Sequence, residues 1–191
     1  MKVQAITLRK GHVLDRDGDG KLWLITGHEI MQPGKGASVI QLEMREIRSG
    51  TKDNVRYRTQ ETLERVRLEQ SDFTYLYNDG ADTYTFMDKE TYEQVEVKKD
   101  VIGDQAKWLQ DGMEVTIESF EGEALGVELP DSVVVTVEEA DPVVKGQTAS
   151  SSYKPAVVTG GVKVLVPPFI EAGTRIVVKT EDGAYSERAK D

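Results

Sequence analysis

The sequence predicts an all-β protein built from several small barrels or sandwiches. Two observations lead to this prediction. Strand-like runs recur along the 191-residue chain, and Gly, Pro, Asn and Asp turn signals separate them about every 8–12 residues. Helical periodicity is scarce, because only one brief stretch, 99–109, is compatible with a helix.

The first part of the chain contains strand pairs around short turns. "SVIQLEMREI" (38–47) alternates Ile40, Leu42 and Met44 with polar residues, which is the period of a half-buried strand. "ITLRKGHVL" and "KLWLIT" also read as strands, and they flank the acidic segment "DRDGDG" (15–20). These runs predict hairpins rather than helices.

"DRDGDG" imitates a calcium-binding loop. Three aspartates hold the first, third and fifth positions and a glycine holds the sixth: Asp15, Asp17, Asp19 and Gly20. The twelfth position should be a bidentate glutamate, but it is Thr26. Because the flanks are strands and the twelfth ligand is missing, the segment favours a plain hairpin turn over a metal site.

The middle and last parts continue the β pattern. "TYLYNDGADTYTFMD" (74–88) predicts two aromatic-rich strands around an Asn-Asp-Gly turn. "KDVIGDQAKWL" (99–109) predicts the short helix. Three further segments, 132–140, 161–170 and 174–185, are rich in β-branched residues and predict strands.

Composition divides the chain into three blocks, which we expect to be domains: 1–65, 66–129 and 130–191. Each is the size of a five-stranded barrel and lies near the lower limit for folding alone. Lys and Arg exceed Asp and Glu by three in the first block, whereas the second has a net charge of −11 and the third of −2. A phosphate-rich partner would therefore be attracted by the first block and repelled by the second.

Several classes of protein are disfavoured by what the sequence lacks. Without cysteine there is no disulfide framework, thiol nucleophile or cysteine zinc site. No apolar run approaches the roughly 18 residues of a membrane helix, and the first residues do not resemble a secretory signal. We therefore expect a soluble, cytoplasmic protein without a membrane partner.

Catalytic patterns are also missing, so we expect no enzyme activity, no cofactor and no metal. His12 and His28 stand at strand edges without a supporting cluster, although a triad assembled in space is not excluded by sequence order. No nucleophile elbow, phosphate loop or dinucleotide fingerprint is present. A small hydrolase is therefore the weaker hypothesis.

"QPGKGA" (32–37) places one lysine among glycines at the end of a predicted hairpin. Pro33 favours a turn, and Gly34 and Gly36 accept backbone angles that other residues resist. Lys35 has no core in which to bury its chain, so we expect it to project into solvent.

The chain resembles the bacterial elongation factor P family over essentially its whole length. "KPAVVTGGVKVLVPPFIEAG" is similar to the family's carboxy-terminal signature, which is carried here by Lys154, Ala156, Gly161, Val164, Val166, Pro167, Ile170 and Gly173. "PGKG" resembles the amino-terminal hairpin tip, "TYLYNDG" and "FMDKETYEQ" the second domain, and "DPVVKGQTA" the third-domain loop. One departure is mild, because "PGKGAS" lacks the second glycine often found after this tip.

The resemblance implies a fold and a function. The fold is a KOW-type, SH3-like barrel followed by two OB-fold barrels in an L-shaped, tRNA-like arrangement. The function is that of a translation elongation factor, which binds the 70S ribosome between the peptidyl and exit sites. There it stimulates peptide-bond formation at consecutive prolines by positioning the P-site tRNA. The implied partners are the ribosome, P-site tRNA and ribosomal RNA, and we expect a monomer.

The resemblance also implies roles for particular residues. Lys35 matches the tip lysine, which in part of the family is extended by a lysine-modifying enzyme. Four residues of the third-domain loop would lie near the exit-site codon: Gly146, Gln147, Thr148 and Ala149. Tyr185 and Arg188 match positions that face tRNA or small-subunit RNA, although Tyr185 could equally serve to pack the last strand.

A different binding module, an OB-barrel protein for single-stranded RNA, is the alternative hypothesis. It would need stacking aromatic residues on a basic face. The acidic middle block speaks against it.

Overall fold

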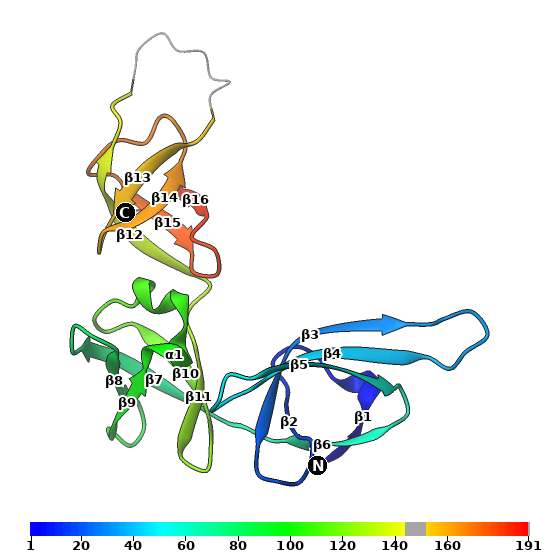
Figure 1. Cartoon of the computed structure of the whole chain (residues 1–191). Coiled ribbons are helices and arrows are strands. Elements are labelled where there is room, and N and C mark those ends of the chain that lie inside the picture. The colour runs from blue at the N-terminus through cyan, green and yellow to red at the C-terminus, as the bar shows by residue number, and fades with distance from the viewer. Residues whose placement is uncertain (144–151, 191) are drawn as a thin grey trace. The chain divides into compact units, whose positions relative to one another are not determined.

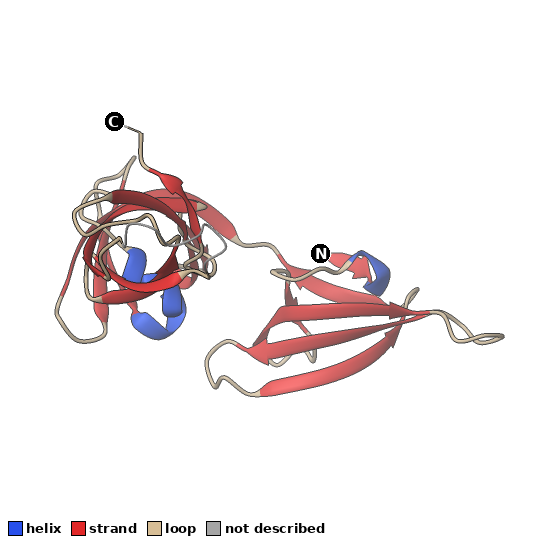
Figure 2. Ribbon diagram, turned by 90° about the horizontal axis from the view of Figure 1, so that it is seen from above, coloured by secondary structure: helices blue, strands red, loops and turns tan. Residues whose placement is uncertain are grey.

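The computed structural model describes residues 1–143 and 152–190, and within them the chain is almost entirely β-structure. Figures 1 and 2 show three sheets that curl into barrels, with short helices as the exception. The predicted fold class is confirmed. Among the described residues, no helix is both long enough and apolar enough to cross a membrane.

The first sheet has six strands in the order β1-β6-β2-β3-β4-β5. Its elements are β1 (Lys2–Gln4), the 3-10 helix η1 (Ala5–Thr7), β2 (Val13–Asp15), β3 (Leu22–Met31), β4 (Val39–Glu46), β5 (Lys52–Arg58) and β6 (Thr62–Val66). The N–H of Ile6 donates to the carbonyl of Thr59 at 3.1 Å, directly after β5. This bond joins the two ends of the strand order, so the sheet curls closed.

The first barrel has a core that the alternation of β4 anticipates. Ile40, Leu42 and Met44 are buried, together with Trp23 and Ile25 of β3. Since burying one large apolar side chain contributes about 1.5–3 kcal/mol, these residues account for a large share of the barrel's stability.

The turn between β2 and β3 contains "DRDGDG", as predicted. Asp15 accepts a hydrogen bond from the N–H of Gly18 at 2.9 Å, and Asp19 accepts one from the N–H of Lys21 at 3.0 Å. The carboxylates thus stabilise the turn by bonding to its own backbone. In the described part of the chain, no group of three or more His, Asp or Glu side chains is arranged to hold a metal ion.

The second sheet has five strands in the order β11-β10-β7-β8-β9. They are β7 (Glu69–Asn78), β8 (Thr83–Asp88), β9 (Gln94–Lys98), β10 (Glu114–Phe120) and β11 (Glu123–Glu128). The predicted helix over 99–109 exists in two pieces, α1 (Lys99–Ile102) and the 3-10 helix η2 (Asp104–Trp108). Gly103 separates them because its φ of +82° ends the first helical turn.

The third sheet has the order β14-β13-β12-β15-β16. Its strands are β12 (Ser132–Ala140), β13 (Lys154–Val158), β14 (Val162–Val166), β15 (Arg175–Lys179) and β16 (Tyr185–Arg188). β12 buries Val133, Val135 and Val137 and exposes the residues between them. The three segments predicted as strands over 132–140, 161–170 and 174–185 are confirmed in type.

The chain divides into two compact units, residues 1–69 with 119–125, and residues 70–118 with 126–191. Within the second unit, two hydrogen bonds join the second barrel and the segment after it to the third barrel. Gln110 donates through Nε2 to the carbonyl of Val134 at 2.8 Å, and Thr180 donates through Oγ1 to the carbonyl of Pro130 at 2.6 Å. The second and third barrels are therefore bonded to each other.

Candidate functional site

The hairpin of β3 and β4 extends beyond the rest of the first barrel (Figure 1). The two strands pair from Trp23↔Glu46 to Met31↔Val39, with a register shift between Ile25 and Gly27. Such a bulge bends a strand and increases its twist. The burial of alternate β3 residues ends at Ile25. The part of β3 after the bulge therefore leaves the core and forms a projecting arm.

Gly27 lies at the bulge and close to the side chain of Glu43. A Cβ atom at this position would lie 2.9 Å from Oε2 of Glu43 on the paired strand. The glycine therefore leaves room for the Glu43 side chain to cross the hairpin, which a larger residue would displace.

The tip of the arm is a hydrogen-bonded turn. The N–H of Gly36 donates to the carbonyl of Pro33 at 2.7 Å, so the four residues 33–36 close a tight loop. Pro33 therefore occupies the first position of this turn, and Gly34 and Lys35 are its two central residues. Every residue from 32 to 37 is exposed.

The two tip glycines serve different purposes. Gly34 has a φ of +33°, in the region that residues with a side chain rarely adopt. Gly36 has no positive φ, but a Cβ there would lie 3.3 Å from the carbonyl oxygen of Pro33. The sequence indicated unusual backbone angles at both positions, whereas at Gly36 the requirement is space.

Lys35 stands at the exposed centre of this turn. In the part of the chain that the structure describes, its ammonium group takes part in no ion pair. Lys89 and Lys98 differ from it, since Lys89 is 2.7 Å from Glu114 and Lys98 is 3.6 Å from Asp82. The primary amine of Lys35, at the end of the paired strands β3 and β4, is thus available to an external partner.

The two histidines differ in their surroundings. His12 is half-buried, and its Nδ1 accepts a hydrogen bond from the N–H of Arg9 at 3.1 Å. Burial, followed by the charges of Arg65 and Arg9, lowers the pKa of His12. His28 lies exposed on β3. His12 therefore acts locally as a neutral hydrogen-bond acceptor.

Tyr185 and Arg188 both lie on β16, the last strand. The half-buried ring of Tyr185 meets that of Tyr153 edge to face, with centroids 6.3 Å apart. Burial raises the pKa of Tyr185. The guanidinium of Arg188 lies 4.9 Å from the ring centre of Phe169. Tyr185 thus has a packing role, while Arg188 is exposed beside an aromatic ring.

The predicted loop contacts Gly146, Gln147, Thr148 and Ala149 lie outside the described residues. The structure therefore brings together only Tyr185 and Arg188 among the predicted third-barrel contacts. The predicted tip residues, Pro33 to Gly36, lie together at the end of the arm, in the other compact unit.

Sequence reasoning missed a set of exposed apolar residues in the third barrel, which contains β16. Tyr153, Leu165 and Phe169 expose 54%, 59% and 51% of their surface. A signal for Leu165 existed, because alternation in "VKVLV" points Val164 and Val166 inward and therefore Leu165 outward.

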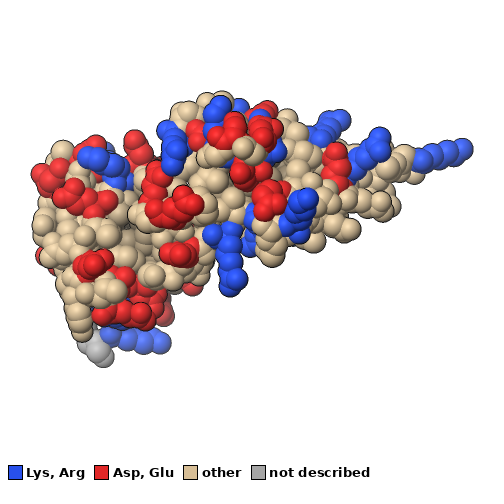
Figure 3. All heavy atoms as spheres, turned by 90° about the horizontal axis from the view of Figure 1, so that it is seen from below, with Lys and Arg blue, Asp and Glu red and all other residues tan. Residues whose placement is uncertain are grey.

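Charge on the surface is mixed. On the face that Figure 3 shows, basic side chains stand apart from one another among acidic ones and form no continuous basic face. An extended single-stranded RNA would need such a continuous groove. This face gives no support to the alternative of a general RNA-binding barrel protein.

Comparison with known proteins gives consistent matches over the whole chain. The family described as the elongation factor P KOW-like domain matches residues 4–63, the elongation factor P OB domain matches residues 68–127, and the elongation factor P C-terminal family matches residues 133–188. Elongation factor P of Rhodospirillum centenum is 62% identical over 191 residues, and that of Gluconobacter oxydans is 54% identical over 191 residues. Each match covers 100% of both chains.

Among solved structures, a eukaryotic translation initiation factor 5A from Methanococcus jannaschii is similar with a TM-score of 0.49 and 23% sequence identity. The match covers 68% of this chain and 92% of that one.

Proposed function

The chain belongs to the elongation factor P family and is a translation elongation factor, and we propose that it binds the 70S ribosome between the peptidyl and exit sites. In this proposal it stimulates peptide-bond formation at consecutive prolines. The observation that carries the proposal is the projecting arm of β3 and β4 with Lys35, exposed and without an ion pair in the described chain, at its tip.

The proposed mechanism is positioning. The ring of proline restricts the approach of its nitrogen, so the P-site tRNA must be held close to the reactive geometry. Misplacing one reactant by about 1 Å can cost roughly a hundredfold in rate. Lys35 would hold the acceptor end of the tRNA by contact with phosphate and ribose. The ribosome supplies the chemistry, and this chain needs no acid or base of its own.

Modification of Lys35 is part of the proposal. An enzyme that extends a lysine needs access to its amine, and every residue from 32 to 37 is exposed. Extension would lengthen the reach of the arm toward the acceptor end. Lysine is the acceptor here, so an arginine-modifying enzyme would have no substrate at this position.

The domain boundaries, the contacts of the third-domain loop, the cellular location and the oligomeric state are also proposals. We propose domains of 1–65, 66–129 and 130–191, with Gly146, Gln147, Thr148 and Ala149 at the exit-site codon. The chain would act in the cytoplasm, as a monomer, with the ribosome and P-site tRNA as partners.

The proposal is tested by adding the purified chain to ribosomes that translate a message with three consecutive prolines. We expect co-sedimentation with 70S ribosomes and faster synthesis of the proline triplet, with no change for a matched message that lacks prolines. A chain that sediments with ribosomes and leaves the triplet rate unchanged would refute the proline function, and a chain that does not sediment would refute ribosome binding.

The carboxy-terminal contact gives a further prediction. Arg188→Ala should lower ribosome affinity about tenfold, because a charge-assisted hydrogen bond to phosphate would be lost. Tyr185→Ala should also lower it, and should destabilise the third barrel because the ring packs on Tyr153. Thermal unfolding and sedimentation would be measured on each, with Lys179→Ala on β15 as the control. Wild-type affinity in Arg188→Ala would show that this contact is not used.

A further inference from the structure

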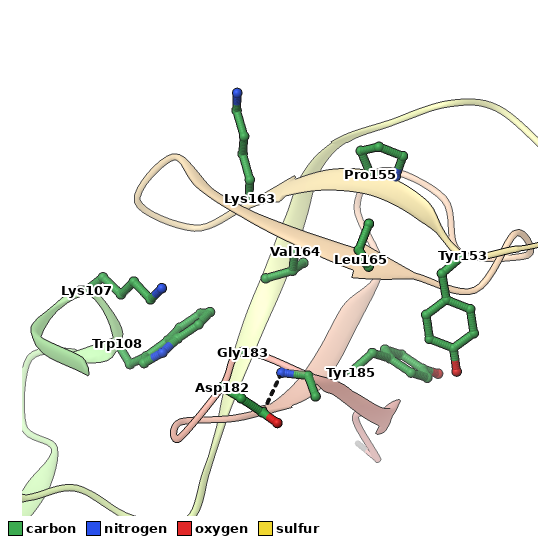
Figure 4. A pocket seen from close by; sticks show the side chains of 11 residues that line it. Lys107, Trp108, Tyr153, Pro155, Lys163, Val164, Leu165, Asp182, Gly183 and Tyr185 are labelled. Carbon is green, nitrogen blue, oxygen red and sulfur yellow. Dashed lines mark hydrogen bonds between the residues drawn. The ribbon is translucent and has the colours of Figure 1, made fainter. Parts of the chain in front are cut away.

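A pocket of about 480 Å³ lies between η2 of the second barrel and the third barrel, both in the second compact unit (Figure 4). Its principal walls are Trp108 of η2, Leu165 of β14, Gly183 and Tyr185 near β16, and Tyr153 before β13. This volume falls within the range of small-molecule sites, about 300–1,000 Å³. Of the described residues proposed above as contacts, Tyr185 lines the pocket, whereas the tip residues 33–36 do not.

The walls are apolar although the pocket is open to solvent. Leu165 is 59% exposed and Tyr153 is 54% exposed, while Tyr185 meets Tyr153 edge to face. Isolated apolar residues on a surface are ordinary, but a contiguous set around a hollow marks a binding site. The two tyrosine rings stand at 87° to each other, so a flat ligand can stack on the face of one ring at a time.

Two cations, Lys107 and Lys163, are among the described lining residues. In the described chain, neither of them takes part in an ion pair. Lys107 lies 5.3 Å from the ring centre of Trp108, and Figure 4 shows Lys163 pointing outward from the rim. In a chain of net charge −10, unpaired cations around an aromatic hollow indicate an anionic aromatic ligand.

The back of the pocket is held in place before any ligand binds. Trp108 is only 2% exposed, and a Cβ on Gly183 would lie 3.1 Å from its Cζ2 atom. Asp182 is the one acid among the lining residues that the structure describes, and its carboxylate accepts a hydrogen bond from the N–H of Ala184 at 2.9 Å. A preformed pocket saves the cost of ordering its side chains on binding.

We propose that this pocket takes one unstacked base of a single-stranded RNA, with the flanking phosphates at Lys107 and Lys163. A base presents a flat face that can stack on one tyrosine ring beside Leu165, and stacking on aromatic side chains is how proteins hold unpaired RNA bases. An apolar peptide would use the walls and leave the ammonium groups of Lys107 and Lys163 without an anion. The inference rests on the proposed binding to the ribosome, and it specifies the form of RNA that the third barrel recognises.

The first test uses hexauridylate and the full chain, without ribosomes. NMR resonances of Tyr153, Leu165 and Tyr185 should shift on titration, and Leu165→Glu should weaken binding about tenfold. Because Leu165 is exposed, this variant should keep the thermal stability of the wild type. Shifts that are absent at millimolar hexauridylate, or that persist unchanged in Leu165→Glu, would overturn the proposal.

The second test identifies the partner on the ribosome. A photo-crosslinking phenylalanine placed at Leu165 should label RNA, whereas the same group at Val134, which is exposed and outside the pocket, should not. Labelling of ribosomal protein alone, or no labelling of a chain that still sediments with ribosomes, would overturn the proposal. If the NMR resonances shift with hexauridylate but the chain does not sediment with ribosomes, the result supports the pocket and refutes the proposed ribosome binding.

Salt dependence tests the role of Lys163. Lys163→Gln should reduce the slope of log affinity for hexauridylate against log salt by roughly 0.7, because one phosphate contact is lost. Lys89→Gln is the matched control, since Lys89 is exposed but already paired with Glu114, and its slope should equal that of the wild type. Equal slopes for Lys163→Gln and the wild type would remove Lys163 from the site.

Discussion

Replacing Lys35 with alanine is expected to abolish the acceleration of proline-triplet synthesis while the protein still folds and still binds ribosomes. The side chain is exposed at the centre of the turn from Pro33 to Gly36, so its removal opens no cavity and breaks no cap. Stability should change by no more than about 0.5 kcal/mol. Ribosome binding should persist because the rest of the surface remains. The rate of triplet synthesis should fall to that measured without the factor.

Two further variants separate the possible roles of the Lys35 amine. Lys35→Arg keeps the charge but removes the primary amine that a modifying enzyme would extend. If extension matters, Lys35→Arg will behave like Lys35→Ala, and if charge alone suffices it will retain part of the activity. Lys21→Ala is the matched control, because Lys21 is an exposed lysine in another hairpin turn of the same barrel. A Lys35→Ala protein as active as the wild type would disprove the proposed role of the tip.

The largest expected loss of stability follows from Trp108→Ala. Trp108 is 2% exposed and lies close to Gly183 of the third barrel, where a Cβ atom would be 3.1 Å from its Cζ2, so its removal leaves a cavity beside the third barrel. Truncating a buried tryptophan costs about 3–5 kcal/mol of unfolding free energy. Trp108→Phe should cost less, because it retains an aromatic ring at the contact.

Urea unfolding can assign this loss to the correct part of the chain. Trp23 is the only other tryptophan and lies in the core of the first barrel, so its fluorescence reports on that barrel in Trp108→Ala. We expect the midpoint from Trp23 fluorescence to stay unchanged while circular dichroism shows a transition at lower urea. An unshifted dichroism midpoint would contradict the buried role of Trp108.

The hairpins were predictable because their signals are local. The two-residue period in 38–47 and 132–140 tells which side chains enter a core, and β4 and β12 bury those residues. The turn at 15–20 was predictable in the same way, since Asp15 and Asp19 bond to backbone within three residues. The exposure of Lys35 also followed from its turn.

Other features were not predicted from the sequence, and some of these are local. The helix over 99–109 was predicted, but its break at Gly103 was not. The sequence suggested that Gly36 is needed for its backbone angle. In the structure, a glycine is needed there because a Cβ atom would come close to the carbonyl oxygen of Pro33. Periodicity indicates that Leu165 faces outward, yet it does not indicate which other exposed residues lie beside it.

The sequence by itself therefore determined the all-β class, the positions of several strands and turns, and the exposed lysine at the arm's tip, although most of 6–14, read as a strand, is a 3-10 helix and coil before β2. Each of these depends on neighbours along the chain. Only the tertiary structure decided the approach of Gly183 to Trp108, 75 positions away, and the meeting of Tyr153 with Tyr185. Alternation within a strand specifies its inner face, but strand pairing and barrel packing specify which outer residues become neighbours, and that information is spread over the whole chain.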